Sequence, residues 1–181
     1  VPALTYTFTG ATTGSGSGSG SGSFFNIGTT TVQITATNTC GAATCSFTVT
    51  VNDTENPVIT CPAPVTVSCA AAVPPANPGA VVATDNCPGV VVTFRGDAIS
   101  GLTCANRYTV TRTYRATDAT GNFVECTQVI TVNDQTPPVI TCPAPVTVSC
   151  AAAVPAVDIS QVVATDNCAG VVTITWQGDV I

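Results

Sequence analysis

Basic residues are nearly absent from this chain of 181 residues, and histidine, lysine and methionine are missing altogether. The only cations are arginines, and the formal net charge is −6. This balance argues against nucleic-acid binding, which requires basic side chains that displace counterions from phosphates, and against binding to anionic membranes. Without His or Lys the chain also lacks the usual general base and Schiff-base nucleophile, so we expect no enzyme.

Aromatic residues are scarce as well, at 6%, and charged residues make up only 8%. No run approaches the roughly 18 apolar residues that a membrane-spanning helix needs, so we expect no membrane insertion. No signal peptide is recognisable, which favours a mature or excised segment. The chain is filled instead by Thr, Val, Ala, Gly and Pro. Thr and Val favour half-buried strands, while Gly and Pro favour turns, so the composition predicts an all-β fold.

Ten cysteines stand out against this background. Zinc sites usually combine closely spaced cysteine pairs with histidines, whereas here the shortest gap runs from Cys40 to Cys45 and no histidine exists. Disulfides in an oxidising compartment are the favoured interpretation. We therefore expect an extracellular location, as a secreted or cell-surface protein.

An internal repeat organises the sequence. The segment ITCPAPVTVSCAAAVP begins at Ile59 and again at Ile140, and the endings SFTVTVND and TQVITVND close at Asp53 and Asp134, so both offsets are 81 residues (140 − 59 and 134 − 53). The repeat predicts one complete domain at 54–134, a C-terminal half-domain at 1–53 and an N-terminal half-domain at 135–181.

Neither half-domain should close a core by itself, because each exposes an apolar face and unpaired strand edges. We expect a neighbouring copy, or chain outside this window, to complete each half. A covalent head-to-tail array is the favoured arrangement, and β-strand addition between separate chains is the alternative.

Short alternating β-runs are separated by Pro, Gly, Asn or Asp. In YTVTRTYRATD, Tyr108, Val110, Tyr114 and Ala116 share one face. The spacing of about six short runs per repeat predicts tandem immunoglobulin-like β-sandwich domains stabilised by disulfides. The runs that we expect in the complete domain are Val58–Cys61, Val65–Cys69, Val81–Thr84, Val90–Phe94, Tyr108–Ala116 and Cys126–Val132.

The entry PVITCP, the corner ATDNC, the stretch FNIGTTTVQITATN, the turn ATDATGN and the closing CSFTVTVND occur in the order of the hyalin-repeat (HYR) family. The chain resembles this family over nearly its whole length, in the form found in extracellular proteins of Bacteroidetes-type bacteria. The resemblance implies tandem immunoglobulin-like sandwiches on secreted or cell-surface proteins, with roles in adhesion and spacing.

The family pattern also implies that the first cysteine of a repeat pairs with the last and the second with the third. One departure is that each copy here keeps only one of two further cysteines that related repeats carry. Cys40 and Cys104 are thus left over, and three alternatives stay open. The two can pair with each other across a domain boundary, both can stay unpaired, or Cys40 can compete with Cys45 for a partner. The implied pairs are Cys61–Cys126, Cys69–Cys87, Cys150–Cys168 and an inter-half pair Cys142–Cys45.

Acidic residues gather at the predicted junctions between repeats. Asp53, Glu55 and Asp134 lie in the linkers VNDTENPV and VNDQTPPV, and Asp118 lies in a turn that could face them, as could Asp85, Asn122 and Asp166. Such oxygen ligands from several segments are the kind that Ca²⁺ uses. Because the ligands are sparse, turn capping by Asp side chains is the favoured interpretation, and we expect no firm metal site or cofactor.

Three further features are assigned ordinary structural roles. Arg95-Gly96-Asp97 matches an integrin-binding tripeptide, but the other copy has Gln177 in place of the arginine, so a turn is favoured. Trp176 is expected in the core. GATTGSGSGSGSGSFF, at 10–25, is expected to be a native loop or edge segment within a domain.

These observations predict a non-enzymatic structural repeat of an extracellular filament, fibre or adhesin stalk, whose partners are copies of itself. The alternative is an adhesive or carbohydrate-binding module of a secreted protein, with surface glycans as partners.

Overall fold

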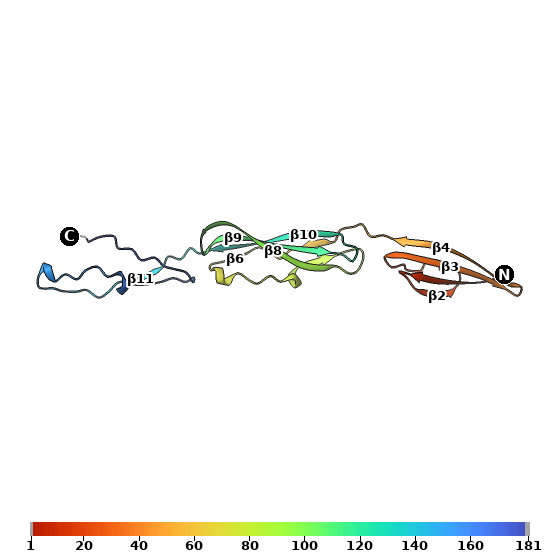
Figure 1. Ribbon diagram of the computed structural model, residues 1–181, viewed down its shortest axis with the longest axis horizontal. Helices are drawn as coiled ribbons and strands as arrows, with labels where there is room; N and C mark the ends of the chain where they lie inside the picture. The colour runs from red at the N-terminus through yellow and green to blue at the C-terminus, as the bar shows by residue number, and fades with distance from the viewer. Residues whose placement is uncertain (1, 180–181) are drawn as a thin grey trace.

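The computed structural model describes residues 2–179, and within this range the chain is built from twelve β-strands and four single-turn 3-10 helices. The all-β class predicted from composition is confirmed. Figure 1 shows an elongated molecule in which three groups of strands follow one another in chain order. We call them the N-terminal segment (2–53), the middle segment (54–134) and the C-terminal segment (135–179). Every strand pairing of the described residues lies within one segment, and no helix among them is long and apolar enough to cross a membrane.

The N-terminal segment is one four-stranded antiparallel sheet in the order β2-β1-β3-β4. Its small core contains Phe8 and Val32, which are 6% and 1% exposed, together with the fully buried Thr30. On the outer strand β4, by contrast, residues 41–48 are all exposed. The strands are β1 (Ala3–Gly10), β2 (Gly14–Ser17), β3 (Gly28–Asn38) and β4 (Gly41–Val51).

The glycine-serine run is part of this sheet, since Gly14–Ser17 pair with β1 as its edge strand. A Cβ atom on Gly16 would lie 2.7 Å from the hydroxyl of Tyr6, and one on Gly20 would lie 2.9 Å from the ring of Phe8. Phe25 then packs on Phe8, with 5.1 Å between ring centroids. The glycines therefore leave space for aromatic rings, and the run belongs to the sheet edge, as expected, rather than to a linker.

The middle segment contains a four-stranded sheet in the order β6-β10-β9-β8 and a two-stranded pair of β5 and β7. Strand β6 runs parallel to β10, and the other pairings are antiparallel. Val110, Tyr114, Ala116, Ile130 and Val132 form its core, each 4% exposed or less. The elements are β5 (Val58–Thr60), β6 (Val65–Val67), η1 (Ala70–Ala72), η2 (Pro78–Ala80), β7 (Val82–Thr84), β8 (Val91–Cys104), β9 (Arg107–Thr117) and β10 (Phe123–Asn133).

Strand β8 differs from the prediction because it continues through the Arg-Gly-Asp tripeptide instead of turning there. The ladder with β9 shifts register between Phe94 and Gly96, which marks a β-bulge within a continuous strand. The carboxylate of Asp97 accepts two hydrogen bonds from Arg112, both 2.8 Å long. Asp97 is thus engaged within the domain, and the expected turn is a bulge.

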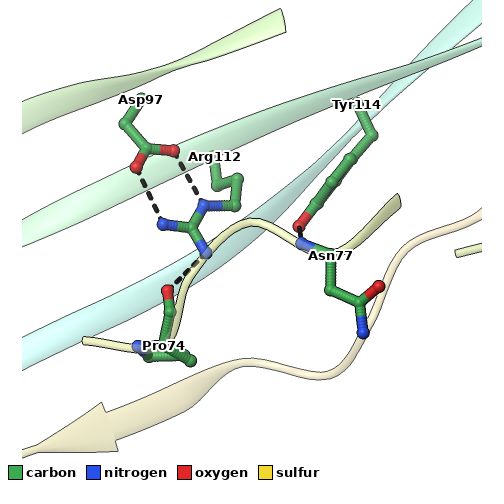
Figure 2. A network of polar contacts seen from close by, with 5 residues as sticks. All are labelled: Pro74, Asn77, Asp97, Arg112 and Tyr114. Atoms are coloured by element: carbon green, nitrogen blue, oxygen red, sulfur yellow. Dashed lines mark hydrogen bonds and ion pairs between the residues drawn. The ribbon is translucent and has the colours of Figure 1, made fainter. Parts of the chain in front are cut away.

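Arg112 lies on the buried face of β9 and forms hydrogen bonds to Asp97 of β8 and to Pro74 (Figure 2). Its side chain is 5% exposed and donates a third hydrogen bond, of 2.8 Å, to the carbonyl of Pro74. Nearby, the amide of Asn77 donates to the hydroxyl of Tyr114 at 3.1 Å. Hydrogen bonding to Asp97 outweighs burial and raises the pKa of Arg112. The network ties the stretch 74–77 to strands β8 and β9.

The C-terminal segment has little regular structure beyond one antiparallel pair of strands. Trp176, expected in a core, is 56% exposed, so that expectation is wrong for this chain by itself. Its counterpart in the middle segment is Phe94, whose ring packs on Tyr114 of β9 with 6.1 Å between the ring centroids. The described part of the C-terminal segment contains no strand equivalent to β9, so Trp176 has no such partner. The elements are β11 (Val139–Thr141), η3 (Ala151–Ala153), η4 (Ile159–Gln161) and β12 (Val163–Thr165).

Candidate functional site

One disulfide lies within the middle segment, and a second joins the middle segment to the C-terminal segment. Cys61, just after β5, is bonded to Cys126 of β10, as the family pattern implied. Cys69 is bonded to Cys168, 99 residues away, and this bond crosses from the middle to the C-terminal segment. The second bond therefore holds one junction between repeats.

The expected pairs Cys69–Cys87 and Cys150–Cys168 are both wrong in this structure. Cys69 lies beside the turn that opens β9, because the amide of Ala70 donates to Asn106. Cys87 lies instead beside Asp53, whose backbone carbonyl accepts a hydrogen bond from Asn122 in the turn after β9. The eleven residues of β9 span about 36 Å, so Cys69 and Cys87 occupy opposite ends of the segment.

Six cysteines of the described residues are free, so no bond joins Cys45 to Cys142 or Cys40 to Cys104 within the chain. Five are exposed, and Cys87 is half-buried. The six are Cys40, Cys45, Cys87, Cys104, Cys142 and Cys150.

The junction between the N-terminal and middle segments contains a cluster of acidic side chains. Ligand atoms of Asp53, Asp85 and Cys87 lie within 4.8 Å of one another. Asp53 is 7% exposed, and the Oδ2 atoms of Asp53 and Asp85 are buried without a hydrogen-bond partner among the described residues. Burial is the largest cause that raises the pKa of Cys87, followed by the nearby Asp53 carboxylate and by the negative charges of Asp85 and Asp118. The thiol therefore stays protonated at neutral pH.

Asp118 organises the turn that docks on this linker. Its Oδ1 accepts backbone hydrogen bonds from Thr120, Gly121 and Asn122 of 2.6–2.9 Å. Burial acts to raise the pKa of Asp118, but these bonds and those from the Asn122 and Thr120 side chains lower it overall. The amide of Asn122 also donates to the backbone carbonyl of Asp53 at 3.2 Å. Of the acidic residues named from sequence, Asp53, Asp85 and Asp118 thus converge, whereas Glu55 is exposed.

The second junction repeats the cluster 81 residues later, with ligand atoms of Asp134, Asp166 and Cys168 within 4.8 Å of one another. A cavity of about 360 Å³ lies beside it, lined by Cys104, Asn106 and Asp134 among others. Asn106 donates to the carbonyl of Ala169 at 3.4 Å, so it contacts the C-terminal segment directly. Both junctions are therefore built from the same linker and corner residues.

The two terminal segments also expose matching surfaces. In the middle segment, Val65 pairs with Ile130 and Val67 with Val132, and both β10 residues are buried. The counterparts of Val65 and Val67 are Val146 and Val148, which are 68% and 38% exposed and lie outside any strand. The counterparts of Ile130 and Val132 are Val49 and Val51 on the free side of β4, and both are only half-buried.

No protein-family model matches this sequence, and no curated protein matches it at a significant level.

Proposed function

We propose that the chain is a structural unit of an extracellular filament, fibre or adhesin stalk, assembled head to tail as tandem immunoglobulin-like sandwiches. The main support for this proposal is that the middle segment contains, in one piece, both of the halves that the two terminal segments contain separately. Strand β6 and the Cys61–Cys126 bond join those halves in the middle segment. The C-terminal segment of one unit and the N-terminal segment of the next are proposed to join in the same way, in one polypeptide or between chains.

The middle segment specifies the contacts of this joint. Val146–Val148 would add to β4 as a parallel strand beside Val49 and Val51, which are the counterparts of Ile130 and Val132. Burial of these side chains supplies a hydrophobic driving force of roughly 25 cal/mol per Å². Cys142 would then bond to Cys45, because their counterparts Cys61 and Cys126 are bonded. Both thiols are exposed and free in the single chain.

The bond across the second junction also has a counterpart. Cys69 bonds to Cys168 of the segment that follows it. The residue 81 positions after Cys69 is Cys150, and the residue 81 before Cys168 is Cys87. Cys150 of one unit is therefore proposed to bond to Cys87 of the next, at the junction beside Asp53.

The last two cysteines would meet at the cavity of the second junction. In the middle segment the turn after β9 docks on Asp53, and the corresponding turn after β3 carries Cys40. Docked in the same way on Asp134 of the preceding unit, this turn would bring Cys40 to Cys104 of the cavity wall. All ten cysteines would then be paired, which suits a fibre exposed to an oxidising environment.

Disulfide mapping and electron microscopy of the purified 181-residue chain test this proposal. Oxidised, concentrated protein is expected to form rods containing a Cys45–Cys142 bond between chains. Cys142→Ser should remove that bond and shorten the rods, whereas Cys104→Ser should leave it in place. Monomers that persist at high concentration under non-reducing conditions, with Cys45 and Cys142 unbonded, would contradict the proposal.

An adhesive or glycan-binding module is the alternative function, and it has weaker support. Trp176 is the one tryptophan and is exposed, but the proposed joint would cover it as Phe94 is partly covered in the middle segment.

A further inference from the structure

At the first junction, the carboxylates of Asp53 and Asp85 each have one oxygen atom that is free to bind a ligand. The backbone amide of Glu55 donates to Oδ1 of Asp53 at 3.1 Å, and the amide of Cys87 donates to Oδ1 of Asp85 at 2.9 Å. One oxygen of each carboxylate is thereby fixed, while each Oδ2 is buried and has no partner among the described residues. Because Asp53 lies more than nine-tenths buried, water does not readily replace the missing partner.

No arginine neutralises this cluster. Arg112 is paired with Asp97, and Arg115 and Arg95 face Glu125. Arg107, the remaining arginine of the sequence, donates to Asn133 at the opposite end of β9 from Asp118. The carboxylates of Asp53, Asp85 and Asp118 thus share one region, and no positive side chain of residues 2–179 lies beside them. Such mutual repulsion is costly unless a cation offsets it.

The chemistry of the ligands favours a hard cation. The unpartnered atoms are carboxylate oxygens, which Ca²⁺ and Mg²⁺ prefer, whereas Zn²⁺ favours thiolate and imidazole. The sulfur in this cluster, Sγ of Cys87, is a soft ligand that neither Ca²⁺ nor Mg²⁺ favours. Ca²⁺ suits a site assembled from separate segments better than Mg²⁺, because Ca²⁺ accepts irregular geometry and longer bonds.

We propose that Asp53 and Asp85 bind one Ca²⁺ ion between the N-terminal and middle segments, with Asp118 supplying a third negative charge. The ion would join the linker after β4 to the corner after β7 and so stiffen the junction. The second junction is expected to bind more weakly within a single chain. Its turn equivalent to Asp118–Asn122 belongs to a neighbouring unit and has Asn38 in place of the aspartate.

This site lies within one chain, so it does not depend on head-to-tail assembly. Isothermal titration calorimetry of the chelator-treated, dilute 181-residue chain with CaCl₂ tests it. We expect one saturable high-affinity site per chain, and a rise in the thermal midpoint on adding Ca²⁺. Asp53→Asn and Asp85→Asn should each weaken Ca²⁺ binding at least tenfold and remove that rise.

Two matched control variants test whether the ion binds at these carboxylates. Asp158→Asn removes an exposed carboxylate from the start of a 3-10 helix in the C-terminal segment and should leave binding unchanged. Cys87→Ser should also retain Ca²⁺ binding, because the thiol is not a ligand. The proposal is overturned if the unmodified chain shows no saturable Ca²⁺ binding, if Asp53→Asn binds as tightly, or if only ZnCl₂ binds and Cys87→Ser abolishes it.

Discussion

Residues 59–74 and 140–155 have the same sequence, ITCPAPVTVSCAAAVP, yet they differ in structure. Both contain a 3-10 turn at the three alanines and a short strand before the first cysteine. Only the first contains strand β6, a disulfide at its first cysteine and half-buried valines. Local features thus follow from the local sequence, whereas the strand and the bond need β10 beside them.

The C-terminal segment, residues 135–179, lacks a partner strand that is distant in the sequence. Short-range pairs such as β11 with β12 form in both segments, because their residues are close along the chain. The parallel pairing of β6 needs a strand about 65 residues later in the sequence (130 − 65). The described part of the C-terminal segment contains no such strand, and the closest equivalent in this chain is β4.

The largest effect should come from removing the disulfide that distinguishes the two copies. Cys61→Ser with Cys126→Ser opens a loop of 65 residues and should destabilise the middle segment by about 4 kcal/mol in urea unfolding. Cys142→Ser in the dilute monomer should leave the unfolding midpoint unchanged. An equal loss in both variants would show that the C-terminal copy already has a folded core of its own.

Breaking the Arg112 pair should come next. Asp97→Ala leaves a buried guanidinium without its partner and should cost about 3 kcal/mol of unfolding free energy. Asp179→Ala, at the corresponding place in the other copy, should cost nothing measurable in the dilute chain, because Asp179 is exposed. Chemical denaturation followed by tyrosine fluorescence measures both. A loss below about 0.5 kcal/mol for Asp97→Ala would mean that the contact drawn in Figure 2 contributes little to stability.

A smaller effect is expected from the valines of β6. Val67→Ala removes part of a half-buried side chain and should destabilise the middle segment by about 1 kcal/mol. Val148→Ala, the same change in the other copy, should have no effect in the monomer but should weaken assembly. Sedimentation at increasing concentration separates these outcomes. An unaltered association constant for Val148→Ala would show that residues 146–148 take no part in the proposed joint.

The smallest effect should come from the hydroxyl of Tyr114. Tyr114→Phe removes the acceptor of the Asn77 amide and should cost about 0.5 kcal/mol, because Asn77 is exposed and water can replace the lost acceptor. Asn77 has its counterpart at Asp158, whose amide has no such acceptor among the described residues, so the C-terminal segment provides the baseline. Hydrogen exchange at Asn77 should accelerate in the variant, and unchanged exchange would contradict the assigned bond.

Much of the fold could be predicted from local pattern. Alternation predicted Tyr108–Ala116, and β9 spans Arg107–Thr117. Arg112 shares the inward parity of Val110 and Tyr114, but its burial depends on Asp97, whose approach across the β8 bulge leaves no signal in the sequence.

The candidate site was partly predictable as well. Asp53 and Asp118 were candidates from their positions in linker and turn, because such positions place oxygen ligands where two repeats meet. The Cys69–Cys168 bond could not be predicted, because it depends on which end of the segment each cysteine occupies.

Hydrogen exchange measured by nuclear magnetic resonance on Thr147 and Val148, compared with Thr66 and Val67, tests whether a neighbouring unit completes the C-terminal segment. The two sites have the same local sequence, so any difference in exchange reports their surroundings. In dilute protein, Thr147 and Val148 should exchange fast and their counterparts slowly. As units assemble, the exchange rates of the two sites should become equal. If the amides of Thr147 and Val148 stay fast in assembled rods, or are already slow in the monomer, residues 146–148 do not gain their strand from a neighbouring unit.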